Sequence, residues 1–323
     1  MNQAAFDRPP FDRRAIPDDA RESMWQAADG HAIRRIDWDV AGDTVRGAIL
    51  FMPGRGDNYE KYLETLDGWH RRGWRVTAAD WRGQAGSGRF GSDDVTGHIE
   101  DFSLWIADLA AFWKDWVAAT PGPHIIVGHS MGGHLVLRAL VEKVIAPRAV
   151  VLVAPMLGYY GTVLPLGWMQ RIAKLLVGRG AADRPAWKWS EKPGETPVGR
   201  INLLTHDTDR YEDELHWRKA RPELVMGPGS WHWVERGYAS MQGIFAKGVL
   251  ESVETPVLLL AARKDKLVDY KAIARAAKRL PHATLEVFGA EARHEILREV
   301  DPVRDRALAV IDRFLDKAAP SPR

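Results

Sequence analysis

The sequence predicts an α/β fold in which a mostly parallel sheet carries helices on both faces and an inserted, largely helical cap. From residue 44 to residue 154, apolar strand patterns alternate with helical patterns, which is typical of parallel sheets covered by helices. Over residues 155–249 the alternation stops without a convincing apolar strand, and it then resumes. We therefore expect a core of residues 1–154 and 250–323, with residues 155–249 inserted into it as the cap.

The composition narrows the class of protein. The 323 residues are 46% hydrophobic and 27% charged and carry a formal net charge of +2, too weak a field to imply a nucleic-acid partner. The chain has no cysteine, which excludes disulfides, thiol nucleophiles and cysteine-ligated metals. Residues 1–19 show no apolar signal-peptide core, and no stretch approaches the roughly 18 apolar residues of a membrane span. We expect a soluble, cytoplasmic protein.

The first part of the chain predicts strands that lead into the sheet. Residues 1–28 predict an extended or short-helical lead-in. Residues 31–40 alternate apolar and polar side chains, and residues 44–52 form a more apolar run after a turn at residues 41–43. Because only a short turn separates the two strand patterns, we expect these strands to pair as an antiparallel hairpin.

Helices and strands then alternate up to the cap. The elements expected here are helices over residues 59–72, 99–119 and 135–143 and strands over residues 74–79, 125–127 and 149–154. The glycine-rich residues 80–88 predict a loop. This loop lacks the Lys-Ser/Thr pair of a phosphate loop, so nucleotide binding is not expected.

The cap and the end of the core complete the pattern. Within the cap, three stretches predict helices: residues 166–177, 211–220 and 233–247. After the cap, the chain predicts strand, helix, strand and helix over residues 256–262, 270–280, 283–288 and 303–317. This order restores the alternation of the core.

One motif stands at the centre of the predicted sheet. Residues 124–134, His-Ile-Ile-Val-Gly-His-Ser-Met-Gly-Gly-His, place a glycine-flanked serine between an apolar strand and a helix. Gly-x-Ser-x-Gly also occurs by chance in ordinary loops, but in this context it indicates a nucleophile elbow, which exposes the serine hydroxyl. The Met131 amide, at the helix start, would face the oxygen on which negative charge develops. We predict Ser130 as a nucleophile.

A serine nucleophile needs a base and an acid, which should follow it in the chain. Asp265 lies in the turn after the first strand that follows the cap, where open sheets place ligands. Asp269 is better placed to cap the next helix. His294 follows the last strand, the position expected of a general base.

The oxyanion hole needs a second amide, and the glycine-rich residues 53–57 are its expected source. The backbone of Arg55 is the candidate, and its side chain could point to solvent or to the substrate. His129 and His134 flank the serine without an acidic third ligand nearby, so no metal site and no cofactor are expected. His129 is expected to be a packing or polar residue beneath the elbow.

Several motifs carry a family resemblance: Pro53-Gly-Arg-Gly, Asp80-Trp-Arg-Gly-Gln-Ala-Gly-Ser, Gly128-His-Ser-Met-Gly-Gly, Asp265 with Val268, and His294-Glu-Ile-Leu. From about residue 28 onward the chain resembles the α/β-hydrolases. Within them it is similar to the monoacylglycerol lipase and bacterial lysophospholipase L2 branch, the serine aminopeptidase S33-like hydrolases. Lipase-type members often begin the oxyanion loop with His-Gly, whereas this chain has Pro53-Gly54, which leaves the anchoring of the loop open.

The resemblance implies the α/β-hydrolase fold and a set of roles. Ser130 would be the nucleophile, Asp265 the acid and His294 the base, with the Arg55 and Met131 amides as the oxyanion hole. The implied activity is hydrolysis of lipid-like carboxylic esters, monoacylglycerol or lysophospholipid, through an acyl-enzyme. A small-molecule esterase remains an alternative.

Two other classes of protein are alternatives to a lipid esterase. A peptidase similar to proline iminopeptidases would bind a substrate amine through an acidic cap cluster, for which Glu212, Asp213 and Glu214 could serve, although a solvated helix face has the same pattern. An inactive binding module is the other class, and the intact serine, aspartate and histidine set speaks against it.

The cap helix expected over residues 166–177 carries an apolar stripe, and Trp168, Ile172 and Leu176 are its candidate substrate-binding residues. A lid over an acyl pocket would have such a stripe, and its basic residues could let it touch the inner membrane peripherally. A helix that simply packs on the core has the same pattern. Both interpretations stay open.

Overall fold

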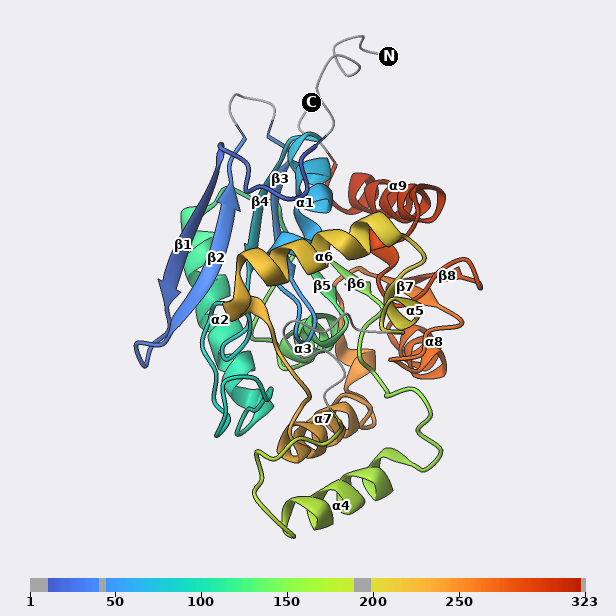
Figure 1. The fold of residues 1–323 in the computed structure, drawn as a ribbon. Coiled ribbons are helices and arrows are strands. Elements are labelled where there is room, and N and C mark those ends of the chain that lie inside the picture. Colours follow the sequence, from blue (N-terminus) through green and yellow to red (C-terminus); the bar gives the residue numbers. More distant parts are fainter. Residues whose placement is uncertain (1–10, 41–44, 189–198, 321–323) are drawn as a thin grey trace.

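The computed structural model describes residues 11–40, 45–188 and 199–320. In these residues, an eight-stranded sheet runs through the molecule in the order β1-β2-β4-β3-β5-β6-β7-β8 (Figure 1). The strands are β1 (Ala20–Gln26), β2 (Ala32–Trp38), β3 (Gly47–Met52), β4 (Trp74–Ala79), β5 (His124–His129), β6 (Ala149–Val153), β7 (Val257–Ala262) and β8 (Ala283–Phe288). Strands β3 to β8 are parallel. The predicted α/β fold is confirmed.

The predicted hairpin is wrong. β2 pairs antiparallel with β1 and β4, whereas β3 lies between β4 and β5 and is parallel to both. All six residues of β3 are buried, but β2 is only partly buried. A fully apolar strand needs neighbours on both sides, and this requirement outweighs the short connection. The turn expected at residues 41–43 lies outside the described residues.

The edge strand β1 falls in the region for which an extended or short-helical lead-in was predicted. Most of its side chains are exposed or half-buried, and Met24 is 51% exposed. It therefore lacks the apolar alternation that marks a strand in the sequence. Antiparallel pairing with β2 holds these residues in a strand instead.

Helices cover both faces of the sheet, as predicted. They are η2 (Tyr59–Tyr62), α1 (Leu63–His70), α2 (Phe102–Ala119), α3 (Met131–Val141), η4 (Leu250–Ser252), α8 (Tyr270–Arg279), η5 (Ile296–Arg298) and α9 (Asp301–Ala318). Phe51 of β3 packs on Trp69 of α1, whereas Thr77 of β4 accepts a hydrogen bond from Trp116 of α2. Phe51 is in register with Ala78, so Phe51 and Thr77 face opposite sides of the sheet. Helices α1 and α2 therefore lie on opposite faces.

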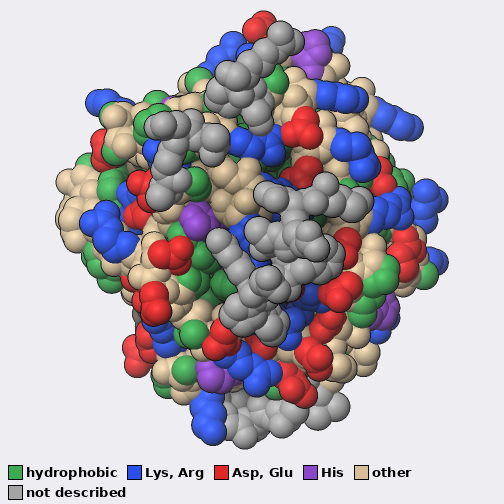
Figure 2. Space-filling model, turned by 90° about the horizontal axis from the view of Figure 1, so that it is seen from above, with side chains coloured by type: hydrophobic (Ala, Val, Ile, Leu, Met, Phe, Trp, Pro, Cys, Tyr) green, Lys and Arg blue, Asp and Glu red, His purple; other side chains and the backbone are tan. Residues whose placement is uncertain are grey.

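The segment between β6 and β7 is helical where the structure describes it. It contains α4 (Leu166–Val177), α5 (Ile201–Leu204), α6 (Thr208–Ala220), η3 (Pro222–Leu224) and α7 (Trp231–Ile244). Helix α4 packs on α7, away from the sheet, while α6 lies against η2 (Figure 1). Seen from above, acidic and basic side chains are interspersed over the surface (Figure 2), in keeping with the small net charge.

Candidate active site

The turn between β5 and α3 has the backbone strain of a nucleophile elbow. Ser130 adopts φ 52° and ψ −117°, a region that non-glycine residues seldom occupy outside functional sites. A Cβ atom at Gly128 would lie 2.8 Å from the Gly132 backbone. A Cβ atom at Gly132 would overlap the carbonyl oxygens of Met52 and Pro53. Both glycines are therefore required for the helix to start so close to the sheet.

The structure brings Ser130, Asp265 and His294 into one hydrogen-bonded chain. His294 Nε2 lies 2.9 Å from Ser130 Oγ, and His294 Nδ1 lies 2.8 Å from Asp265 Oδ2. The other oxygen of Asp265 accepts two backbone N–H bonds at 2.7 and 3.0 Å. Asp269 instead caps α8, as predicted. This geometry allows His294 to take the proton of the serine hydroxyl.

Burial and neighbouring charges shift the pKa values of His294 and Asp265. Burial by itself lowers the pKa of His294, but the Asp265 carboxylate outweighs burial, and the net pKa is raised above the ordinary 6.5. Burial raises the pKa of Asp265, but His294 and the two N–H donors outweigh it, and the net pKa is lowered. The carboxylate is therefore charged at neutral pH and favours the protonated form of His294.

Residues 53–57, which we call the oxyanion loop after the role predicted for them, pass beside Ser130. A Cβ atom at Gly54 would lie 3.0 Å from Ser130 Cβ, so the absence of a side chain permits the approach. Met131 is the first residue of α3, where amides have no acceptor inside the helix. The two amides predicted for the oxyanion hole, those of Arg55 and Met131, thus belong to segments that border the serine.

The Arg55 side chain joins the oxyanion loop to the segment between β6 and β7. Its guanidinium carbon lies 5.0 and 5.2 Å from the ring centroids of Trp187 and Trp233, a cation–π arrangement. It also donates a hydrogen bond to the Gly227 carbonyl at 2.6 Å. From the sequence this side chain was expected to point to solvent or to the substrate. It packs against two aromatic rings, and Arg55 also lines the pocket at Ser130.

A pocket of about 510 Å³ opens at Ser130 and His294. Its wall is mainly apolar and aromatic and includes Tyr159, Trp187, Leu204, Met226, Trp233 and Tyr238. These six residues come from the segment between β6 and β7, while the core supplies the polar floor. The pocket therefore forms between the two parts of the chain.

The structure places the three cap candidates elsewhere. Within the described residues, Trp168, Ile172 and Leu176 do not line the pocket. Trp168 and Ile172 are 58% and 42% exposed on α4, and Leu176 is half-buried. An apolar stripe does not reveal which side of a helix faces the site. The pocket gives no support to the substrate-binding role expected of these residues.

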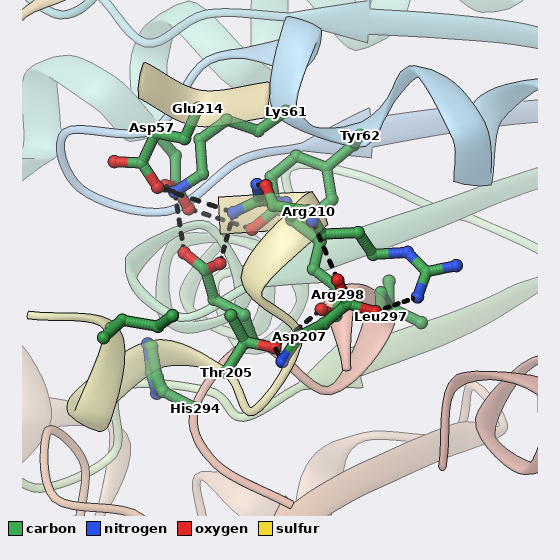
Figure 3. Close-up of polar contacts among 12 residues, drawn as sticks. Asp57, Lys61, Tyr62, Thr205, Asp207, Arg210, Glu214, His294, Leu297 and Arg298 are labelled. Atoms are coloured by element: carbon green, nitrogen blue, oxygen red, sulfur yellow. Dashed lines mark hydrogen bonds and ion pairs between the residues drawn. The ribbon is translucent and has the colours of Figure 1, made fainter. Parts of the chain in front are cut away.

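A buried group of charges, which we call the Lys61 cluster, lies behind the site and was missed in the sequence (Figure 3). Its members are Asp57, Lys61, Glu214, Glu295 and Arg298. Lys61 Nζ lies 2.6 Å from Asp57, 2.6 Å from Glu295 and 3.0 Å from Glu214. Arg298 pairs with Glu295 and, at 3.5 Å, with Glu214. The cluster joins the oxyanion loop, the segment after His294 and helix α6.

His129 links this cluster to His294. Its Nδ1 lies 3.1 Å from Asp57 Oδ2 and 2.9 Å from the Tyr62 hydroxyl, and its Nε2 lies 3.4 Å from the His294 carbonyl oxygen. Burial by itself raises the pKa of Asp57, but Lys61 and His129 outweigh it and hold that pKa well below its usual range. His129 thus lies beneath the elbow, as predicted, and its ring contacts polar groups there.

The ring of His134, the other histidine of the motif, contacts α7 and takes no part in the hydrogen-bonded chain of Ser130, His294 and Asp265. Its Nε2 lies 2.7 Å from Ser240 Oγ, and burial lowers its pKa to about 3, so the ring is neutral. Among the described residues, no group of three or more histidine and carboxylate side chains could hold a metal ion.

Comparison with known proteins identifies the family of this chain. The family described as serine aminopeptidase, S33, matches residues 43–301. The chain belongs to this S33 hydrolase family. This chain is 31% identical to lysophospholipase L2 of Escherichia coli (strain K12) over 289 residues. The match covers 84% of this chain and 82% of the relative. It is 24% identical to the probable lysophospholipase L2 of Haemophilus influenzae, with 84% of each chain covered.

A solved structure supports the fold of the S33 chain. A soluble variant of monoglyceride lipase from Saccharomyces cerevisiae superimposes with a TM-score of 0.73 and 19% sequence identity, covering 96% of this chain and 98% of that one. This likeness identifies the α/β-hydrolase fold. Within the described residues, no helix is both long and apolar enough to cross a bilayer.

Proposed function

We propose that this S33 hydrolase is a serine esterase that cleaves lipid-like carboxylic esters through an acyl-enzyme. The observation that carries the proposal is the chain from Ser130 through His294 to Asp265, which opens into an apolar pocket. The relatives named lysophospholipase L2 and the lipase of the same fold support an ester substrate with an acyl chain, monoacylglycerol or lysophospholipid.

The proposed reaction uses side chains, backbone amides and water. Ser130 Oγ attacks the ester carbonyl carbon while His294 Nε2 takes the hydroxyl proton, and Asp265 holds the imidazolium in place. The Arg55 and Met131 amides stabilise the negative oxygen of the tetrahedral intermediate. His294 then protonates the leaving alcohol, and the acyl group remains on the serine. Water, deprotonated by His294, releases the carboxylic acid and restores the serine.

An aminopeptidase is the alternative suggested by the family description, and the geometry does not favour it. Glu214 is buried against Lys61, and Asp213 accepts a 2.7 Å bond from Arg14. Neither these residues nor Glu212 line the pocket that the described residues form. The two carboxylates in its wall, Asp57 and Glu295, share Lys61. The acidic groups near the site are thus already neutralised by the protein's own cations.

We also propose that residues 155–249 act as a lid that touches a lipid surface with α4. Trp168 and Leu175 of α4 are 58% and 55% exposed, and Val163, shortly before this helix, is 89% exposed. Residues 155–182 contain three basic residues and no acidic one. An exposed apolar patch with basic neighbours suits the interface of an anionic bilayer such as the inner membrane.

The decisive experiment on the function is a Ser130→Ala substitution with two readouts. The native protein should hydrolyse a monoacylglycerol and a lysophospholipid and should react with a fluorophosphonate probe. Ser130→Ala should lose both activities while its thermal unfolding stays close to that of the native protein. Hydrolysis retained by the variant would refute the proposal. Cleavage of aminoacyl-arylamides in preference to esters would favour the peptidase, and a preference for short acyl chains would favour a small-molecule esterase.

A further inference from the structure

The oxyanion loop needs an outside anchor. Glycines precede and follow Arg55, and Gly56 has a φ of 66°, so the backbone of this loop has more freedom than most. Its amides can stabilise an oxyanion only if each is held about 2.7–3.1 Å from the position of that oxygen. The His-Gly start common in lipase-type relatives is replaced here by Pro53-Gly54. Another part of the chain must therefore fix the loop.

The loop after β4 provides that anchor at two points. Trp81 Nε1 donates a 2.8 Å hydrogen bond to the carbonyl oxygen of Pro53. Gln84 Oε1 accepts a 2.8 Å hydrogen bond from the Gly56 amide. The Trp81 and Gln84 residues are only 2% and 3% exposed, so water does not compete readily for these bonds. The two bonds bracket the Gly54 and Arg55 backbone.

The same glutamine also touches the elbow. Gln84 Nε2 lies 3.7 Å from the sulfur of Met131, the residue whose amide is the other oxyanion donor. The backbone of Gln84 is itself held in a turn. Its backbone N–H donates to the Trp81 carbonyl at 2.9 Å, and its backbone carbonyl accepts from the Ser87 N–H at 2.8 Å. The Gln84 side chain thus contacts both segments that supply the proposed oxyanion donors.

We infer that Gln84, assisted by Trp81, is a positioning residue of the oxyanion hole. This inference rests on the proposed function, because it assigns a geometric task within that reaction. Neither side chain touches the reacting atoms, and both act through the backbone of the oxyanion loop. A displacement of about 1 Å in such a site is enough to lower a rate by roughly a hundredfold.

The test compares Gln84→Met and Trp81→Phe, which remove one hydrogen-bonding group each and keep most of the packing. Ser87→Ala is the matched control, because Ser87 is buried in the same loop and its hydroxyl bonds the Arg34 amide instead of the oxyanion loop. For Gln84→Met we expect kcat to fall by roughly tenfold to a hundredfold, with KM changed by less than about threefold. Trp81→Phe should show a smaller fall of the same kind, and the control should keep the native kcat.

A second readout separates positioning from general loss of structure. A trifluoromethyl ketone that adds to the serine forms an oxyanion, so its affinity should fall in step with kcat/KM in Gln84→Met. The inference is overturned if the folded variant keeps the native kcat and inhibitor affinity, or if only KM changes. If Gln84→Met does not fold, as judged by circular dichroism, the same measurements on Trp81→Phe decide. Activity that survives in Ser130→Ala would instead refute the proposed function, so the two failures are distinguishable.

Discussion

Lys61 Nζ lies 2.6 Å from Glu295 Oε1, and Glu295 is the residue that directly follows His294. Through this contact a completely buried ammonium group is bound to the segment that carries the proposed base. The same ammonium group holds Asp57 of the oxyanion loop and Glu214 of α6. The charge balance of three separate parts of the chain therefore depends on Lys61, with Arg298 as a second cation beside Glu295 and Glu214.

The first prediction concerns this dependence. Lys61→Met leaves the three buried carboxylates of the cluster without the cation that they share, and a broken buried ion pair costs about 3–5 kcal/mol. Urea unfolding should show a loss of that size. Lys219→Met, on the exposed end of α6, is the control and should change the stability by less than about 0.5 kcal/mol. Equal stability of the two variants would contradict the role of the Lys61 cluster.

The second prediction concerns Asp265 and pH. His294 must be neutral to act as a base, and its pKa is raised above 6.5. Activity should therefore fall as the pH drops through a value above 6.5. Asp265→Asn removes the carboxylate and leaves burial, which lowers the pKa, so this acid limb should move to lower pH. We also expect kcat to fall by about 10⁴-fold, as in known serine triads.

Asp269→Asn is the matched control for that experiment. Asp269 caps α8 four residues after Asp265, and asparagine caps a helix about as well as aspartate. Its pH–rate profile for ester hydrolysis should match that of the native protein. A similar loss of activity in both variants would argue against a specific role of Asp265.

The third prediction tests the packing of the elbow. In Gly132→Ala the new Cβ atom would overlap the carbonyl oxygens of Met52 and Pro53. Overpacking of this kind costs about 1–3 kcal/mol, and the shifted helix start should also reduce ester hydrolysis. Gly243→Ala in α7, where nothing lies within 4 Å, should instead raise the stability by about 0.5–1 kcal/mol. Thermal unfolding and an aryl-ester assay measure both variants.

The fourth prediction concerns the outer face of α4. The protein should float with vesicles that contain anionic lipid, and high salt should weaken the binding because screening reduces the attraction of the basic residues. Trp168→Ser should reduce flotation without changing hydrolysis of a soluble aryl ester. Met24→Ser, at an exposed apolar residue of β1, should leave flotation unchanged. A native protein that fails to bind even at low salt would rule out the lipid-contact proposal.

Local patterns were sufficient for a large part of this molecule. The strand and helix periodicities fixed the α/β class because each depends on residues only a few positions apart. The elbow could be predicted because strand, serine and helix are contiguous in the sequence. Asp265 and His294 could be predicted because each follows a strand of the core. The capping role of Asp269 depended on the same local logic.

Other features required contacts between distant residues. The sequence by itself determined the class of fold, the elbow and the order of the proposed nucleophile, acid and base, because these depend on neighbours along the chain. The tertiary structure alone decided the position of β3 inside the sheet, the pocket wall, the Lys61 cluster and the anchoring of Pro53 and Gly56 by Trp81 and Gln84. Each of these joins segments far apart in sequence, and the burial that makes the contacts strong exists only after the chain has folded.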